Sequence, residues 1–267
     1  DFKGYRGGRI NQVLQSMKDI TIHDMEKLQT EVYNSFAAEA LPFMLSHLQV
    51  AGLGASERIW LDSLRGWNLN NEPYETGPSL FHLWWDSLYA DLWSGYLPKA
   101  ASPVPQPDDK VTIELVEADT GLHFLRRIPP RIRDIRAMDL DAFHKAMGEA
   151  TRAGGRHLQW GIFQGTDIMH LARLAAFSYM GLYTGGGEHI VNATKRAHGP
   201  SWRMIVQLSD PVRAVGILPG GESGNPGSRF YGDMIPDWVA GRYYPLHFMS
   251  RNHPKDPDIR YIVQYSR

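Results

Sequence analysis

The first hundred residues place their apolar side chains at helical spacing. Four of them recur at steps of three and four along one face: Met25, Leu28, Val32 and Phe36. Thr21 and Asp24 precede this face with the spacing of a capping box, in which two side chains satisfy free N–H groups at the start of a helix. The pattern predicts a helix that begins after Thr21 and continues through Phe36.

Three more helical segments are predicted in this part of the chain. The first covers 41–48, with Pro42 in its first turn, where a helix needs no donor from the proline nitrogen. Ser56 is expected to cap a short second helix. The third, at 79–97, spreads its leucines and tryptophans too widely for one narrow stripe, which predicts burial on more than one side.

The middle of the chain mixes loop and helix signals. Three prolines predict a loop over 100–107, and Val111–Val116 is expected to form a strand. The pattern at 140–152 predicts a helix that ends at Gly154. Five arginines lie between 126 and 136, and no element is assigned to them.

From His157 the apolar period changes. Leu158, Trp160 and Ile162 alternate with other residues, which favours a strand. Further strands are expected at 190–193, 202–208, 212–218, 243–248 and 259–265, with a short helix at 235–240. Helices therefore come first and strands later, without the rhythm of a βαβ fold, so the class is α+β. Three parts follow: a helical module at 1–100, a loop and helix at 101–156, and a β-rich part at 157–267.

Composition narrows the possible functions. The chain has 267 residues, 43% of them apolar and 21% charged, which excludes general disorder and allows one large or two ordinary domains. The net charge of -1 offers no excess of basic residues for a nucleic-acid backbone. The absence of cysteine excludes disulfides, thiolate metal sites and a cysteine nucleophile. Eight tryptophans suit a large core or a pocket for an apolar group.

The sequence predicts no membrane span. Its longest apolar candidate, Ile168–Tyr183, is interrupted by Arg173 and falls short of the ~18 apolar residues that a spanning helix needs. The chain opens at Asp1 without the basic, apolar and small-residue order of a signal peptide. We interpret this start as a cut, made by processing or by design.

Candidate metal and nucleophile sites are weak by motif. The eleven histidines form no HExxH pair. His82 is expected to be a hydrogen-bonded core residue, and His170, His189 and His198 could meet only through the fold. No G-x-S-x-G elbow is present, and Ser201 and Ser223 are expected to be turn serines.

Two glycine-rich stretches need an explanation. The three glycines at 185–187 precede a strand-like segment rather than a helix, which is the wrong context for phosphate binding. The stretch at 220–228 either turns the chain sharply or lets backbone approach a ligand closely. Spacing alone leaves both readings of this second stretch open.

Two long motifs resemble the penicillin acylase (penicillin amidase) family. One is GGESGNPGSRFY at 220–231, followed by Trp238, Gly241, Tyr244, Pro245, Leu246 and Phe248. The other begins at Asn192 and Ala193 and continues as GPSWRM at 199–204. The opening, with Tyr5, Arg6, Arg9, Ile10 and Leu14, is similar to the segment that follows the oxyanion asparagine in this family. Residues 100–156 match poorly, so 101–156 is expected to be a variable insertion.

The resemblance implies an N-terminal nucleophile (Ntn) hydrolase. In this family a precursor cleaves itself, and the new N-terminal serine of the β chain attacks an amide, with its own α-amino group as the base. Backbone N–H groups and an asparagine hold the oxyanion. The predicted fold is then a helical module followed by antiparallel strands of an αββα-type core, and a periplasmic or secreted location is implied by the family.

The match also departs from the family pattern. Asp1 carries a carboxylate and cannot be the serine nucleophile. The chain therefore resembles the C-terminal part of the β chain, with the nucleophile and the oxyanion asparagine expected upstream. Calcium, which some members bind, is expected to have its ligands outside this chain, and no cofactor or metal is assigned within it. The expected partners are the remaining α- and β-chain segments of the precursor and a small acyl-amide substrate, with no nucleic acid and no membrane span.

One residue of the catalytic centre is assigned by the resemblance. Arg6 matches the arginine that stands beside the nucleophile and helps to position its amine and the substrate. Asn192, Trp202 and Arg203 are interpreted mostly as scaffold, because strand-like runs of this kind usually pack a sheet. Glu222 stands where the family often has glutamine.

Three functions remain open from the sequence. The first is part of an amidohydrolase acting on N-acyl amides, of the β-lactam side-chain or acyl-homoserine lactone type. The second is a non-catalytic scaffold or interaction fragment of a relative. The third is a complete small binding protein, supported only by the aromatic content.

Overall fold

The structure is a computed structural model, and it describes residues 4–94, 96, 105–118, 134–248, 263 and 265. The helices are α1 (Tyr5–Ser16), α2 (Ile22–Gln29), α3 (Ser35–His47), α4 (Ala55–Arg65), α5 (Gly77–Trp93), α6 (Asp109–Ala118), α7 (Ile135–Ala153), α8 (Trp160–Phe163) and α9 (Ile235–Val239). Short 3₁₀ turns are η1 (Val50–Gly52), η3 (Gly155–Leu158) and η4 (Ala175–Phe177). The strands are β1 (Thr166–Ile168), β2 (Tyr179–Leu182), β3 (Arg203–Gln207), β4 (Arg213–Ile217) and β5 (Tyr244–Leu246).

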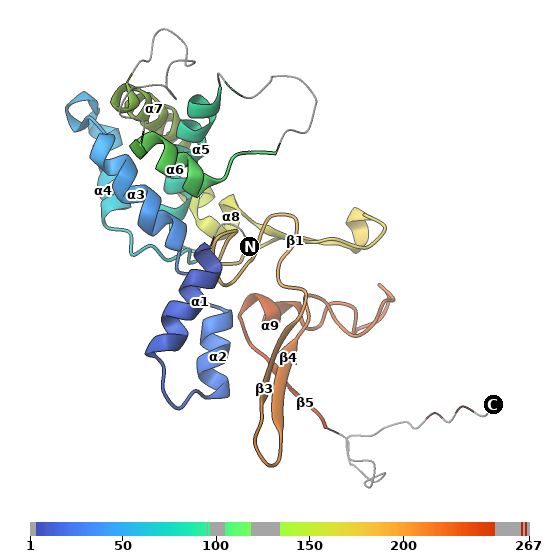
Figure 1. Ribbon diagram of the computed structural model, residues 1–267. Helices are drawn as coiled ribbons and strands as arrows, with labels where there is room; N and C mark the ends of the chain where they lie inside the picture. Colours follow the sequence, from blue (N-terminus) through green and yellow to red (C-terminus); the bar gives the residue numbers. More distant parts are fainter. Residues whose placement is uncertain are drawn as a thin grey trace.

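Helices α3 to α7 form one body, and the strands lie on the other side of α1, α2 and α8 (Figure 1). The main core lies within the helical body, where α5 packs along α7. Trp84 of α5 meets Phe143 of α7 edge to face, with ring centroids 4.8 Å apart. Alanines at 142, 146 and 150 of α7 are fully buried, and these small side chains leave room for the large rings of α5.

The structure confirms the signals that start and stop two helices. Thr21 Oγ1 accepts a hydrogen bond from the Asp24 N–H, and the Asp24 carboxylate accepts one from the Thr21 N–H, so the predicted capping box is present. Helix α7 ends at Gly154, whose φ of 75° suits glycine. Helix α5 is buried on several sides, as its apolar distribution predicts.

Three details of the predicted helices are wrong. The face through Phe36 is divided between two helices: α2 ends at Gln29, and Asn34 caps α3 by accepting a hydrogen bond from the Ala37 N–H. Pro42 lies inside α3 rather than in a first turn, because the buried side chains around it hold the helix together. The short helix α4 begins after Gly54, not after Ser56.

The segment Val111–Val116 is helical, not a strand. Thr112, Ile113 and Val116 are buried on one side of α6, and Trp93 Nε1 donates to Thr112 Oγ1 at 3.2 Å. Packing on one helical face here outweighs the preference of β-branched residues for strands. The arginines before residue 134 and most of the loop at 100–107 lie outside the described residues.

The strands form two antiparallel groups, β1 with β2 and β3-β4-β5. The predicted strands at 202–208, 212–218 and 243–248 and the helix at 235–240 are confirmed within one or two residues at most ends. Residues 158–162 are not a strand: Leu158 ends η3, and α8 begins at Trp160. The segment 190–193 is not a strand either, and residues 190–192 form a bend. The strand expected at 259–265 falls mostly outside the described residues.

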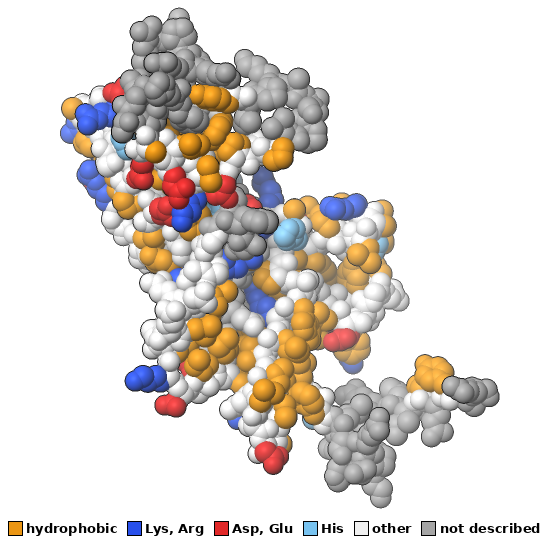
Figure 2. Space-filling model, viewed as in Figure 1, with side chains coloured by type: hydrophobic (Ala, Val, Ile, Leu, Met, Phe, Trp, Pro, Cys, Tyr) orange, Lys and Arg blue, Asp and Glu red, His pale blue; other side chains and the backbone are white. Residues whose placement is uncertain are grey.

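One face of the three-stranded sheet is open to solvent. Arg203 and Ile205 are buried, whereas Met204 and Val206 are 45% and 40% exposed. Figure 2 shows hydrophobic side chains gathered over these strands. Among the described residues, no helix is long and apolar enough to cross a membrane.

Candidate functional site

The candidate site begins with the glycine-rich loop at 185–187. A Cβ at Gly185 would lie 2.8 Å from the Asn71 carbonyl oxygen, and one at Gly186 only 2.2 Å from that of Asn192. Gly186 also has a φ of 95°. The glycines therefore let this loop pack closely against its neighbours. Glu188 and His189, the next two residues of the chain, are positioned by this packing.

Arg6 anchors the same loop from the first turn of α1. Its Nε donates to the Ile190 carbonyl oxygen at 3.1 Å, and its Nη2 donates to the Glu188 carbonyl oxygen at 2.8 Å. The forked guanidinium thereby holds both sides of His189. Tyr5, the preceding residue, packs edge-on against the His189 ring at 5.4 Å. Arg6, which the resemblance assigns to the catalytic centre, thus holds the backbone of the loop at 188–190.

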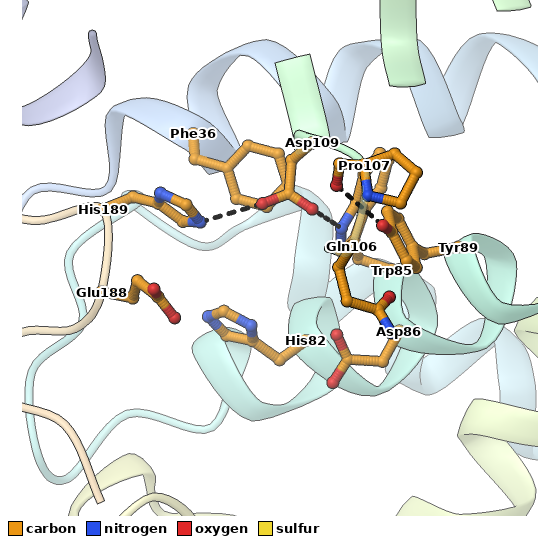
Figure 3. A pocket seen from close by; sticks show the side chains of 10 residues that line it. All are labelled: Phe36, His82, Trp85, Asp86, Tyr89, Gln106, Pro107, Asp109, Glu188 and His189. Atoms are coloured by element: carbon orange, nitrogen blue, oxygen red, sulfur yellow. Dashed lines mark hydrogen bonds and ion pairs between the residues drawn. The ribbon is translucent and has the colours of Figure 1, made fainter. Parts of the chain in front are cut away.

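The loop closes one side of a cavity of about 370 Å³ (Figure 3). Four lining residues come from α5, at a spacing that places them on one helical face: His82, Trp85, Asp86 and Tyr89. The others are Phe36, Gln106, Pro107, Asp109, Glu188 and His189. The sequence predicted a helix at 79–97, but it did not show that residues near 107 and 188 would lie opposite this face of α5.

Asp109 links three segments at the cavity. One carboxylate oxygen lies 3.2 Å from His189 Nε2, and the other accepts a hydrogen bond from Trp85 Nε1 at 3.1 Å. Tyr89 donates to the Pro107 carbonyl oxygen at 2.7 Å, which holds the approach to α6. The loop, α5 and α6 are therefore joined by polar contacts around the cavity.

His82 and Asp86, two ionisable residues of the cavity, have shifted pKa values. Burial, with a smaller effect of nearby His189, lowers the pKa of His82 to about 4, so this imidazole is neutral at pH 7. Burial and the Asp109 charge raise the pKa of Asp86 to about 6. Asp86 is an exposed residue of the cavity lining, and the neighbouring walls partly desolvate its carboxylate.

His82 differs from its prediction as a hydrogen-bonded core residue. Its ring stacks on Trp160, at 4.8 Å and 18°, and makes no hydrogen bond to a described residue. His170 lies elsewhere, where its Nδ1 accepts from the Ala172 N–H. The described part of the chain holds no group of three His, Asp or Glu residues arranged to bind a metal ion.

A second, smaller cavity of about 220 Å³ lies between the β1–β2 region and the loop at 220–228. A Cβ at Gly221 would meet the Phe230 carbonyl oxygen at 2.1 Å, so this loop approaches its own chain closely. Ser223 Oγ accepts from the Asn225 N–H at 3.1 Å, which is the predicted turn role. Ser201 and Glu222 are exposed, and neither side chain forms a hydrogen bond with a basic group among the described residues.

The two sequence motifs meet in a buried cluster. Arg203 is 4% exposed, and it donates to Asn192 Oδ1 at 2.7 Å and to the Trp238 carbonyl oxygen at 2.8 Å. Its guanidinium also lies over the Trp238 ring at 5.0 Å. This cluster is the scaffold expected for Asn192 and Arg203, whereas Trp202 remains 46% exposed.

Comparisons with known proteins identify the class. The sequence model of the penicillin amidase family matches residues 2–255, and the chain belongs to this family. The chain is 26% identical over 220 residues to the acyl-homoserine lactone acylase QuiP of Pseudomonas syringae pv. syringae. It is 30% identical over 92 residues to the protein of the same name from Pseudomonas aeruginosa.

The fold comparison gives the same class. The structure is similar to the thermostable penicillin G acylase from Alcaligenes faecalis, with a TM-score of 0.52 and 12% identity. That match covers 99% of this chain and 52% of the solved one. The matched segments span 23% and 11% of the two QuiP proteins. The α+β architecture is therefore that of penicillin acylase, and the chain spans about half of the solved relative.

Proposed function

We propose that this chain is the C-terminal portion of an amidohydrolase that cleaves N-acyl amides of the β-lactam side-chain or acyl-homoserine lactone type. The observation that carries the proposal is the family match over residues 2–255. An N-terminal serine attacks the acyl carbonyl, and its α-amino group takes the hydroxyl proton and delivers it to the leaving amine. Water then releases the acid and frees the serine.

The nucleophile and the oxyanion asparagine of this proposal come from sequence outside the 267 residues, so this chain alone is inactive. Its strands form part of an αββα-type core, which the remaining segments of the precursor complete. The open sheet face with Met204 and Val206 supports this, because apolar side chains on one face of a sheet are normally covered. Calcium, which some members of the family bind, has its ligands outside this chain in this proposal.

Arg6 acts in this proposal as a positioning residue. Both of its hydrogen bonds go to carbonyl groups of the loop at 188–190, so its guanidinium fixes the backbone of a segment rather than a substrate. If the catalytic serine lies beside Arg6, as the family resemblance implies, the same contacts set the distance between the loop and the reacting groups.

The first test is intact mass spectrometry of the full-length gene product after expression. Two chains, the heavier beginning with serine, are expected from self-cleavage. The matured protein should release acid from a panel of N-acyl amides, and replacing that serine by alanine should abolish release. A single uncleaved product with no acid release would reject the proposal.

The second test concerns Arg6 in the matured protein. Arg6→Ala should lower kcat by up to about 100-fold, because small displacements of positioned groups have effects of this size. Arg6→Lys, which can still reach one carbonyl, should recover part of the loss. Arg65→Ala is the matched control, since among the described residues Arg65 pairs only with Asp62, on the surface of α4. Equal activity of the Arg6→Ala and Arg65→Ala variants would remove Arg6 from the mechanism.

The alternative is a non-catalytic scaffold within the same family. Its basis is the poor match at 101–156, and a maturation serine in the gene would count against it. A periplasmic or secreted location is proposed from the family alone. Fractionation of cells that express the full-length gene would test that location.

A further inference from the structure

The cavity between α5 and α6 carries chemistry that the proposed amide hydrolysis does not use. Asp86 projects from α5 beside Gln106 and His82 (Figure 3). No described residue forms a hydrogen bond or an ion pair with its carboxylate. This position therefore has a negative group that is accessible from the cavity and has no counter-charge among the described residues.

The basic groups nearby are already engaged or neutral. Lys195 Nζ lies 3.2 Å from the Glu188 carboxylate, and His189 pairs with Asp109. His82 has a lowered pKa and carries no charge at neutral pH. None of these described side chains compensates Asp86, and the like charge of Asp109 adds to the cost of its ionised form.

The walls suit an organic group better than a hydrated metal ion. Trp85 and Tyr89 lie on the same face of α5 as Asp86, and their rings contribute aromatic surface to the cavity. Aromatic side chains beside a carboxylate are typical of sites for ammonium groups. The described residues provide no set of metal ligands. A volume of about 370 Å³ is within the range of small-molecule sites.

We propose that this cavity binds a small organic cation, a protonated amine. Its ammonium group lies against the Asp86 carboxylate, and its apolar part lies against Trp85 and Tyr89. Arg6 supports the site indirectly, because it holds the loop that brings Glu188 and His189 to the opposite wall. The inference goes beyond the proposed hydrolysis and does not depend on it.

Calorimetric titration of the full-length gene product with benzylammonium tests the proposal. Benzyl alcohol is the matched neutral probe, since it has a similar size and no charge. At about pH 7.5, benzylammonium should bind at least about tenfold more tightly than benzyl alcohol. Equal binding of the two probes, or binding of neither, would overturn the inference. Hydrolysis is not measured, so this result is independent of the proposed activity.

Asp86→Asn should reduce benzylammonium binding by about tenfold or more, whereas Asp62→Asn on the exposed surface of α4 should leave it unchanged. Circular dichroism checks that both variants fold. If the Asp86→Asn variant is unfolded, the binding of benzylammonium to the unmodified protein is measured at two pH values instead.

Benzylammonium binding should weaken about tenfold from about pH 7.5 to 5 as Asp86 gains its proton. The other ionisable groups that line the cavity are His82, Tyr89, Asp109, Glu188 and His189. Unchanged binding in either experiment would contradict a role for Asp86.

Discussion

Asp139 offers the sharpest test of the helical core. It lies in the second turn of α7 and is fully buried, and neither carboxyl oxygen has a hydrogen-bond partner among the described residues. Burial raises the pKa of this carboxyl to about 8, because a charge in an apolar interior loses its hydration. Asp139 is therefore protonated in the folded chain at neutral pH.

The consequence for stability has a definite sign. The unfolded carboxyl titrates near 3.8 and the folded one near 8, so between these values the folded state holds a proton that the unfolded state has lost. The free energy of unfolding then falls by about 1.4 kcal/mol for each pH unit. From pH 5 to 8 the loss attributable to Asp139 is about 4 kcal/mol, and above pH 8 it no longer grows.

The Asp139→Asn variant keeps the shape of the side chain and removes the titration. It should match the unmodified chain below about pH 3.8, and its advantage in free energy of unfolding should grow by about 4 kcal/mol between pH 5 and pH 8. Urea unfolding followed by circular dichroism at several pH values measures the difference. Asp141→Asn is the control, because Asp141 is partly exposed on the same helix and pairs with Lys145 at 2.6 Å. Parallel pH profiles for the Asp139→Asn variant and the unmodified chain would refute the reasoning.

Two further predictions concern stability. Gly186→Ala should lower the free energy of unfolding by more than about 2 kcal/mol, because the new Cβ would meet the Asn192 carbonyl oxygen. Gly148→Ala within α7 should instead raise the free energy of unfolding by about 1 kcal/mol. Thermal unfolding of both variants checks these opposite signs. Arg203→Ala should cost about 3 kcal/mol because it leaves the Asn192 amide oxygen and the Trp238 carbonyl without their donor. Arg203→Lys should restore only part of this, and equal urea midpoints for the three proteins would contradict the buried role.

Local signals in the sequence were sufficient where a single element decides the outcome. The Thr21–Asp24 capping box and the stop at Gly154 depend on neighbouring residues, and both are present. Strands β3 and β4 also follow from sequence, because the β-like runs at 202–208 and 212–218 mark both of them. The family could be predicted as well, since its motifs are continuous stretches of the chain.

The errors fall where tertiary packing decided the element. Val111–Val116 became a helix because Ile113 and Val116 are buried together on one side of α6. Leu158 and Trp160 are buried at a chain turn, where Trp160 Nε1 donates to the Gly186 carbonyl oxygen at 2.7 Å. Contacts with distant residues supplied the stabilisation in both places, and a local period does not contain that information.

The sequence by itself determined the class α+β, the family and the buried helix α5, one face of which carries His82, Trp85, Asp86 and Tyr89. The tertiary structure alone decided what that face meets. Asp109 reaches it from the start of α6, and His189 reaches it from a loop that the Arg6 guanidinium holds. The physical reason is that a cavity forms from side chains about a hundred residues apart, whose meeting depends on the packing of the whole core and not on any local preference.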